Sequence, residues 1–330
     1  MLKAVLLFIV GLVLLIKGGD WFVDGATGIA KKFNIPDLLI GATVVSIGTT
    51  LPEVMVSSSA AVSGQGSIAY GNALGSIICN TALISAITIA VKPGLIERKS
   101  LKTPVIFFFA SASFYAVIAY AFGFFYRWTG IVLLAVFIIY IFILVKQARD
   151  EMKNPTAAAS DAASEEEEVK EHPFYLNVIL LIVGAALIAV GADLLVDNGT
   201  IIATELGVPE TVIALTFVAL GTSLPELVTA ITSLAKGHGA LSLGNVIGAN
   251  LFNLVLVSGM SITLSPFKVP ADKLLPGTNI NASLAVDIPL VFAVMLLMTL
   301  PGLIKGKLYR WQGILLLLIY FSYCIFQFVG

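Results

Sequence analysis

An internal repeat is the feature that most constrains this chain. A shift of 173 residues, without a gap, aligns 11–80 with 184–253, and 24 of the 70 positions are identical. The shift places two motifs on their copies, GTTLPE (48–53) on GTSLPE (221–226) and GNALGS (71–76) on GNVIGA (244–249). Chance similarity between apolar segments does not keep charged, proline and asparagine positions in register. The fold must therefore accommodate two copies of one unit.

Composition places both copies in a membrane. Of the 330 residues, 58% are hydrophobic and 12% are charged, whereas a soluble domain has roughly 25% charged residues. Lys and Arg number 19 against 20 Asp and Glu, so the chain lacks the basic surface that a nucleic-acid partner requires. We expect a polytopic protein whose surroundings are the lipid bilayer.

Ten segments are long and apolar enough to span the bilayer, which takes about 20 residues each. Five fall in each copy, and an odd number makes the second copy enter the membrane from the opposite side. The predicted fold is an all-α membrane protein with two inverted five-helix repeats, 1–148 and 175–330, and discontinuous helices at its site. The predicted spans are 3–32, 36–62, 67–91, 103–123, 128–147, 175–206, 209–235, 240–265, 284–303 and 309–329.

The connection between the copies, 149–174, is rich in acidic residues and reads as a solvated linker. A regulatory ion-binding role for it is the alternative. With the N-terminus outside, 14 of the 19 Lys and Arg fall in inside loops, as the positive-inside rule requires. We therefore expect a plasma-membrane protein with both termini outside and a cytoplasmic linker.

Cysteine and histidine are too scarce for several kinds of chemistry. Cys79 and Cys324 lie in apolar runs, and His172 and His238 lie in polar connections. The sequence offers too few Cys and His residues for a zinc site or a Ser-His-Asp triad. An intramembrane hydrolase built on Ser223 and Glu226 would lack an oxyanion device. We expect no enzyme activity and no bound cofactor.

One carboxylate lies in the middle of the second span of each copy. Glu53 and Glu226 follow Pro52 and Pro225 in the middle of apolar segments, where a carboxylate needs a partner or a wet cavity. A proline cannot donate to the carbonyl four residues earlier. We therefore expect broken helices that release carbonyl oxygens beside the hydroxyls of Thr49, Thr50, Thr222 and Ser223. An all-oxygen site of this kind suits a hard cation such as Ca²⁺.

The third span of each copy adds amides. Asn72, Ser76 and Asn80 recur four residues apart on one helical face, and Asn245, Ala249 and Asn253 match them. For Asn80 and Asn253 ion contact is the favoured interpretation. For Asn72 and Asn245, hydrogen bonding between helices is an equal alternative. The repeated pairs Asp20/Asp24 and Asp193/Asp197 are assigned to helix-surface or interface hydrogen bonding, with ion entry or gating as the alternative.

The paired G-T-[TS]-L-P-E and G-N-x-x-G-[SA] motifs resemble the Na⁺/Ca²⁺ exchanger family of the Ca²⁺/cation antiporter superfamily, in its prokaryotic form. The resemblance implies a central Ca²⁺ held by the carboxylates of Glu53 and Glu226 and the carbonyls of Thr49 and Thr222. It implies one flanking Na⁺ site from Glu53, Thr50, Ser76 and the Ser46 carbonyl. The other would use Glu226, Ser223 and the Ala219 carbonyl, with Asn80 and Asn253 lining the centre.

The sequence departs from the family pattern at two positions. Ala249 replaces a serine found in many relatives, which removes one hydroxyl. Asn253 replaces an aspartate of some microbial and potassium-dependent relatives, which argues against K⁺ transport.

The resemblance implies Na⁺/Ca²⁺ antiport, typically three Na⁺ for one Ca²⁺ and so electrogenic. Alternating access would come from sliding of the first and sixth helices. We expect Na⁺ and Ca²⁺ as the transported partners and a monomer as the working unit. A Ca²⁺/H⁺ or other cation antiporter is the alternative, and a cation channel belongs to a different class.

Overall fold

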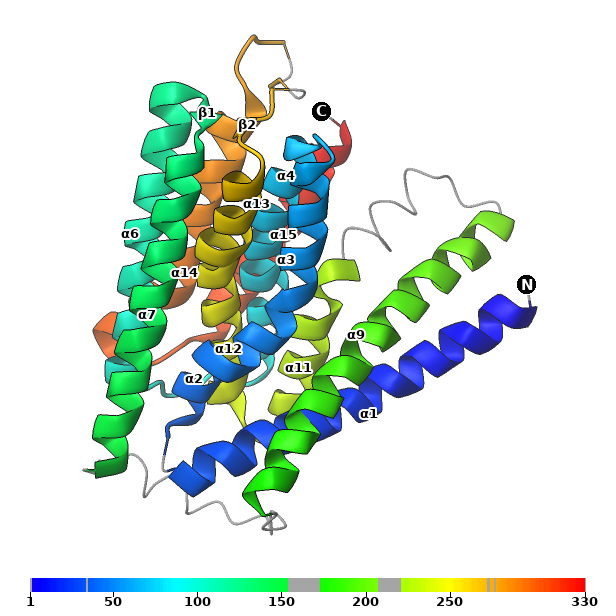
Figure 1. Cartoon of the computed structure of the whole chain (residues 1–330), viewed down its shortest axis with the longest axis vertical. Helices are drawn as coiled ribbons and strands as arrows, with labels where there is room; N and C mark the ends of the chain where they lie inside the picture. Colours follow the sequence, from blue (N-terminus) through cyan, green and yellow to red (C-terminus); the bar gives the residue numbers. More distant parts are fainter. Residues whose placement is uncertain are drawn as a thin grey trace.

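The computed structural model describes residues 2–33, 35–153, 173–206, 221–271, 274–275 and 277–329. In Figure 1 these residues form a helical bundle, with two long helices lying obliquely against it. A short antiparallel pair, β1 (Phe124–Phe125) and β2 (Phe267–Lys268), joins two connections at one end. Most of the predicted linker and the first half of the predicted span 209–235 lie outside the described residues.

The helices follow the predicted spans closely. In chain order they are α1 (Leu2–Phe33), α2 (Asp37–Ile40), η1 (Gly41–Val45), α3 (Ser46–Val62), α4 (Gly66–Cys79), η2 (Asn80–Ser85), α5 (Ala86–Val91), α6 (Arg98–Phe122), α7 (Arg127–Lys153), α9 (Phe174–Glu205), η4 (Gly221–Ser223), α11 (Leu224–Ala235), α12 (Gly239–Phe252), η5 (Asn253–Val257), α13 (Ser258–Leu264), η6 (Ser283–Asp287), α14 (Ile288–Lys305) and α15 (Arg310–Val329). Helix α7 continues past the predicted linker start at 149, because its last residues are good helix formers.

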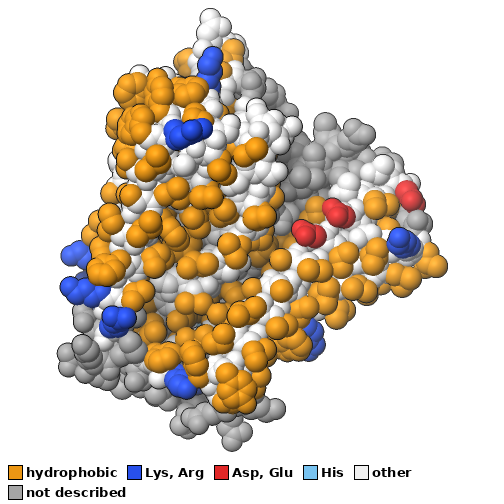
Figure 2. Space-filling model, viewed as in Figure 1, with side chains coloured by type: hydrophobic (Ala, Val, Ile, Leu, Met, Phe, Trp, Pro, Cys, Tyr) orange, Lys and Arg blue, Asp and Glu red, His pale blue; other side chains and the backbone are white. Residues whose placement is uncertain are grey.

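Eight helices within the described residues are long and apolar enough to cross a membrane. They include the composite spans Asp37–Val62, Gly66–Val91 and Gly239–Leu264. Helix α15 is not among the eight, and α11 has only 12 residues in its described part. On the face shown in Figure 2, hydrophobic side chains are spread over the helices and charged side chains are few, as a lipid-facing exterior requires. The chain is a multi-pass membrane protein.

The expected helix break at Pro52 is wrong. Helix α3 runs through Pro52 without interruption, and the irregular turn is the π-helix η1, which ends at Val45. A single proline removes one hydrogen bond, and the neighbouring turns continue the helix. In the second copy, helix type changes from 3₁₀ in η4 to α at Leu224, so Pro225 occupies the first turn, where proline is tolerated.

The two copies share one irregular turn, a π-helix after the third span's first half. Helices α4 and α12 begin and end 173 residues apart, and each passes directly into a π-helix that starts at Asn80 or Asn253. A π turn holds one extra residue and is frequent at functional sites. Ser258 Oγ bonds the Asn253 carbonyl at 3.0 Å, five residues back, which satisfies an acceptor that the wide turn leaves.

Helices α1 and α9 pack antiparallel along their glycines. A Cβ added at Gly11 would lie 2.9 Å from the Gly191 carbonyl, and one at Gly18 would lie 2.9 Å from the Gly184 carbonyl. Gly184 and Gly191 are the repeat equivalents of Gly11 and Gly18. Each contact thus occurs twice with the roles exchanged, which is the mark of an isologous interface.

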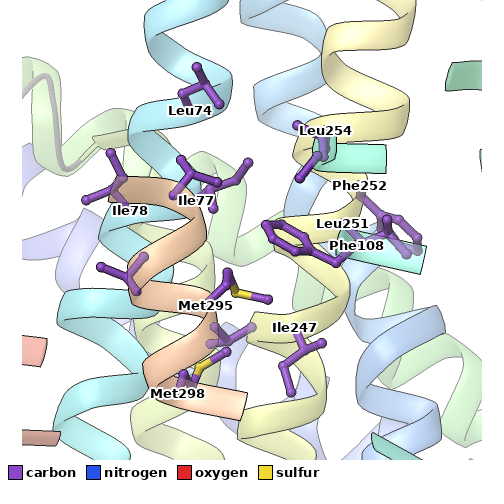
Figure 3. Packing of buried hydrophobic residues seen from close by; sticks show 14 of the residues in the cluster. Leu74, Ile77, Ile78, Phe108, Ile247, Leu251, Phe252, Leu254, Met295 and Met298 are labelled. Atoms are coloured by element: carbon purple, nitrogen blue, oxygen red, sulfur yellow. The ribbon is translucent and has the colours of Figure 1, made fainter. Parts of the chain in front are cut away.

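The hydrophobic core supports the motif-bearing helices. Figure 3 shows Ile77 and Ile78 of α4, Ile247 and Leu251 of α12 and Met295 and Met298 of α14 packed together. All six side chains are at most 1% exposed. This packing fixes α4 and α12 next to one another, at the point where both change into π-helices.

Candidate ion-binding site

Four segments pack against one another: α3, α11 and the composite spans α4–η2 and α12–η5. Helix α3 contacts α4 and η5, whereas α11 contacts α12 and η2. Glu53 on α3 and Glu226 on α11 are both 0% exposed. They lie close enough for their charges to interact. The fold therefore brings the two carboxylates of the repeat near one another.

Neither the Glu53 nor the Glu226 carboxylate makes a hydrogen bond within the described residues. Two buried hydroxyls, Thr50 Oγ1 and Ser223 Oγ, and both polar side-chain atoms of Asn80 and of Asn253 share this property. Buried polar groups in native proteins are almost always paired, and an unpaired one is expensive. This concentration of unsatisfied oxygen and amide groups fits a site that binds cations.

Thr49 and Ser46 connect the two copies at the site. Thr49 Oγ1 donates to Asn245 Oδ1 at 3.2 Å, and Ser46 Oγ donates to the Asn245 carbonyl at 2.9 Å. The Ser46 carbonyl faces Thr49 Oγ1 at 3.4 Å. Thr49 also lies beside the Glu226 carboxylate. Thr49 of the first copy thus lies at the carboxylate of the second copy.

The other residues assigned to the ion sites differ in their burial and in the elements that they contact. Ser76 is 4% exposed and lies one turn before Asn80 on α4. Ser223 lies beside Cys79, which places it against the end of α4. Thr222 belongs to η4, whereas Ala219 lies outside the described residues. Ala249 is fully buried on α12 and brings no hydroxyl.

Asn72 and Asn245, for which the sequence leaves ion contact and hydrogen bonding between helices open, both take part in hydrogen bonds. Asn72 Nδ2 donates to Ser57 Oγ at 2.8 Å, which ties α4 to α3. Asn245 ties α12 to α3 through Thr49 and Ser46. The structure therefore shows helix-to-helix bonding at both positions.

Sequence reasoning missed two hydroxyls. Thr229 and Ser233 are 0% exposed, and neither side-chain oxygen has a partner in the described part of the chain. They follow Glu226 at i+3 and i+7, so helical periodicity could have placed them on its face. They extend the polar face of α11 from the carboxylate toward the end of the helix.

A small recess lies between α3, the start of α11 and α9. Its walls are Gly48, Thr49, Pro52, Pro225 and, from α9, Ala185, Ile188 and Ala189. The two motif prolines thus line the same recess as residues of α9. The backbone around Gly48, whose carbonyl lacks the proline N–H, borders this recess.

Comparisons with known proteins agree on one family. The family model described as sodium/calcium exchanger protein matches residues 3–146 and 176–329. An uncharacterized membrane protein of Methanocaldococcus jannaschii is 35% identical over 315 residues, 95% of this chain and 94% of the relative. The sodium/calcium exchanger MaX1 of Methanosarcina acetivorans is 30% identical over 352 residues, 98% of each chain. A solved structure of the sodium-calcium exchanger NCX_Mj superposes with a TM-score of 0.78 at 33% identity, over 97% of each chain.

A lipid-facing helical bundle with these relatives is a membrane transporter and not an enzyme. The chain belongs to the sodium/calcium exchanger family, as the motifs predicted.

Proposed function

We propose that this chain is a secondary active antiporter that exchanges Na⁺ for Ca²⁺ across the plasma membrane. The observation that carries the proposal is the pair of fully buried, interacting carboxylates, Glu53 and Glu226, without partners among the described residues. Two adjacent buried carboxylates repel and are desolvated, so the site needs positive charge. One Ca²⁺ balances both charges. The names of MaX1 and NCX_Mj support Na⁺ and Ca²⁺ as the ions.

The ligand sets follow the family resemblance. Ca²⁺ would bind Glu53, Glu226 and the carbonyls of Thr49 and Thr222. Na⁺ would bind on either side, one ion at Glu53, Thr50, Ser76 and Ser46 and the other at Glu226, Ser223 and Ala219, with Asn80 and Asn253 between them. The unpaired state of Thr50, Ser223, Asn80 and Asn253 supports these assignments.

Coupling follows from competition for the same carboxylates. Because both ions need Glu53 and Glu226, they cannot be fully bound together. An empty site leaves two repelling charges in a region of low dielectric, which opposes crossing between the inward-open and outward-open forms. Two carboxylates balance two Na⁺, so a third Na⁺ would make the exchange electrogenic.

The proposed architecture has ten spans in two inverted repeats. The 173-residue spacing of α4 and α12 and the antiparallel, isologous pairing of α1 with α9 support it. Both termini would lie outside and the acidic linker in the cytoplasm. Alternating access would come from movement of α1 and α9 against the bundle, in a monomer without a bound cofactor.

The test is ⁴⁵Ca²⁺ uptake into proteoliposomes under imposed gradients of Na⁺, K⁺ or protons. We expect uptake when the vesicles are loaded with Na⁺, and faster uptake when the vesicle interior is positive. An outward K⁺ gradient should not replace the Na⁺ gradient. Uptake driven by a pH gradient without Na⁺ would instead identify a Ca²⁺/H⁺ antiporter. Flux without any counter-ion would identify a channel.

A further inference from the structure

The turn between α11 and α12 holds two helices of the first copy. Lys236 Nζ lies 2.7 Å from Asp24 Oδ1, 3.0 Å from the Asp20 carbonyl and 3.6 Å from Asp20 Oδ1, all on α1. Two residues later, His238 Nδ1 lies 2.9 Å from Asp37 Oδ2, at the first residue of α2. The turn thus contacts both helices that flank the α1–α2 connection.

The Lys236 contact coincides with close packing of the backbone. A Cβ added at Gly19 on α1 would lie 2.8 Å from Thr232 Oγ1 and 2.8 Å from Val228 Cγ1, both on α11. The ammonium has three donors, and α1 presents three oxygens to it. The Lys236 side chain is 28% exposed, so the pair is partly shielded from water. Charge and shape therefore hold α1 on α11 at the same place.

The repeat does not reproduce this arrangement. The aspartates on α1 have equivalents on α9, Asp193 and Asp197. The shift of 173 places Lys236 on Ser63 and His238 on Gln65, which carry no charge. The turn that follows α3 therefore has no lysine to offer α9. The contact between α1 and α11 is also more extensive than the described contact between α9 and α3.

We propose that Lys236 with Asp20 and Asp24 forms a one-sided electrostatic latch, which holds α1 against α11 in the conformation seen here and has no counterpart between α9 and α3. Movement of α1 away from α11 separates the ammonium from both carboxylates. The conformation seen here is thus favoured over one in which α1 has moved. The part the latch plays in transport rests on the proposed function, whereas its effect on α1 does not.

The test is amide hydrogen exchange of α1, followed by mass spectrometry of the full chain in lipid nanodiscs. The test variant is Lys236→Ser, which copies the repeat equivalent. The control is Lys17→Ser, because Lys17 lies 3.9 Å from the same Asp20 but belongs to α1 itself. We expect amides after Asp20 to exchange roughly two- to fivefold faster in Lys236→Ser than in wild type, and to be unchanged in Lys17→Ser.

Salt supplies a second measurement that needs no substitution. Because ion pairs at partly exposed positions are screened, raising the salt concentration should speed exchange of these amides in wild type and have no further effect in Lys236→Ser. Equal exchange in Lys236→Ser and Lys17→Ser, or a wild-type rate independent of salt, would overturn the latch. Loosening of α1 in a protein without Na⁺-driven Ca²⁺ uptake would instead refute the proposed function alone.

Discussion

Thr49 of the first copy donates a 3.2 Å hydrogen bond to Asn245 of the second, across 196 residues of sequence. Both side chains are at most 2% exposed. Because Thr49 also lies beside the Glu226 carboxylate, this bond fixes a group of one copy at the charged centre of the other. Residues of both copies therefore meet at the candidate site.

Removing the amide of Asn245 should weaken ion binding. In Asn245→Ala the Thr49 hydroxyl loses its acceptor, Asn245 Oδ1, at a cost of about 1–2 kcal/mol, whereas the bond from Ser46 to the Asn245 backbone carbonyl is kept. We expect the Ca²⁺ concentration for half-maximal uptake to rise about tenfold, with the maximal rate largely kept. Asn72→Ala is the comparison, because Asn72 bonds Ser57 Oγ on α3, whereas Asn245 bonds Thr49. An equal effect in both variants would mean that the amides only support packing.

Neutralising either buried carboxylate should abolish exchange. In Glu53→Gln or Glu226→Gln one negative charge remains, which cannot balance a bound Ca²⁺ in a region of low dielectric. We expect ⁴⁵Ca²⁺ uptake into Na⁺-loaded vesicles to fall to background in both variants. Glu97→Gln is the control, since Glu97 lies outside the spans and accepts a hydrogen bond from Ser100. Retained uptake in either test variant would refute the assignment of the site.

A third carboxylate at the start of η5 should change ion selectivity. Asn253 is fully buried, and both polar atoms of its side chain are unpaired in the described part of the chain. In Asn253→Asp an added charge favours a further cation, so we expect a new sensitivity of uptake to K⁺ or to pH. Asn80→Asp adds the same charge at the repeat equivalent and provides the comparison. Uptake that responds to Na⁺, K⁺ and pH as in wild type would exclude a lining role for Asn253.

Filling the glycine interface between α1 and α9 should destabilise the protein. A Cβ in Gly18→Ala would lie 2.9 Å from the Gly184 carbonyl and the Ile188 amide nitrogen, which belong to rigid backbone. We expect a loss of roughly 1–3 kcal/mol, seen as a lower midpoint of thermal unfolding in detergent. Gly94→Ala makes the same change where nothing lies within 4 Å. Similar midpoints for the two variants would contradict the close approach of α1 and α9.

Much of the fold and the centre of the site could be predicted from the sequence. Glu53 and Glu226 stood out because a carboxylate within an apolar span is expensive and because the repeat preserves both. The starts of α4 and α12 lie one residue before the predicted spans 67–91 and 240–265, whereas the change to a π-helix at Asn80 and Asn253 was not predicted. The ion ligands themselves, and the count of ten spans, remain predictions.

Other features depend on tertiary contacts that no local pattern encodes. The prediction of a break at Pro52 failed because packing carries α3 through the proline, and the irregular turn moved to η1. Lys236 and Asp24 lie 212 residues apart. Their pairing could not be predicted because the first copy has Ser63 at the position equivalent to Lys236, so the repeat gave no signal.

The antiparallel pairing of α1 and α9 has an electrical consequence. Phe33 at the end of α1 packs on Phe174 at the start of α9, with ring centroids 5.4 Å apart. A helix carries about half a positive charge at its N-terminus and half a negative charge at its C-terminus. At this end of the pair the two partial charges cancel. If α1 and α9 move together, their backbones carry no net charge through the membrane field, and the voltage dependence of transport reports the bound ions and the ionised side chains.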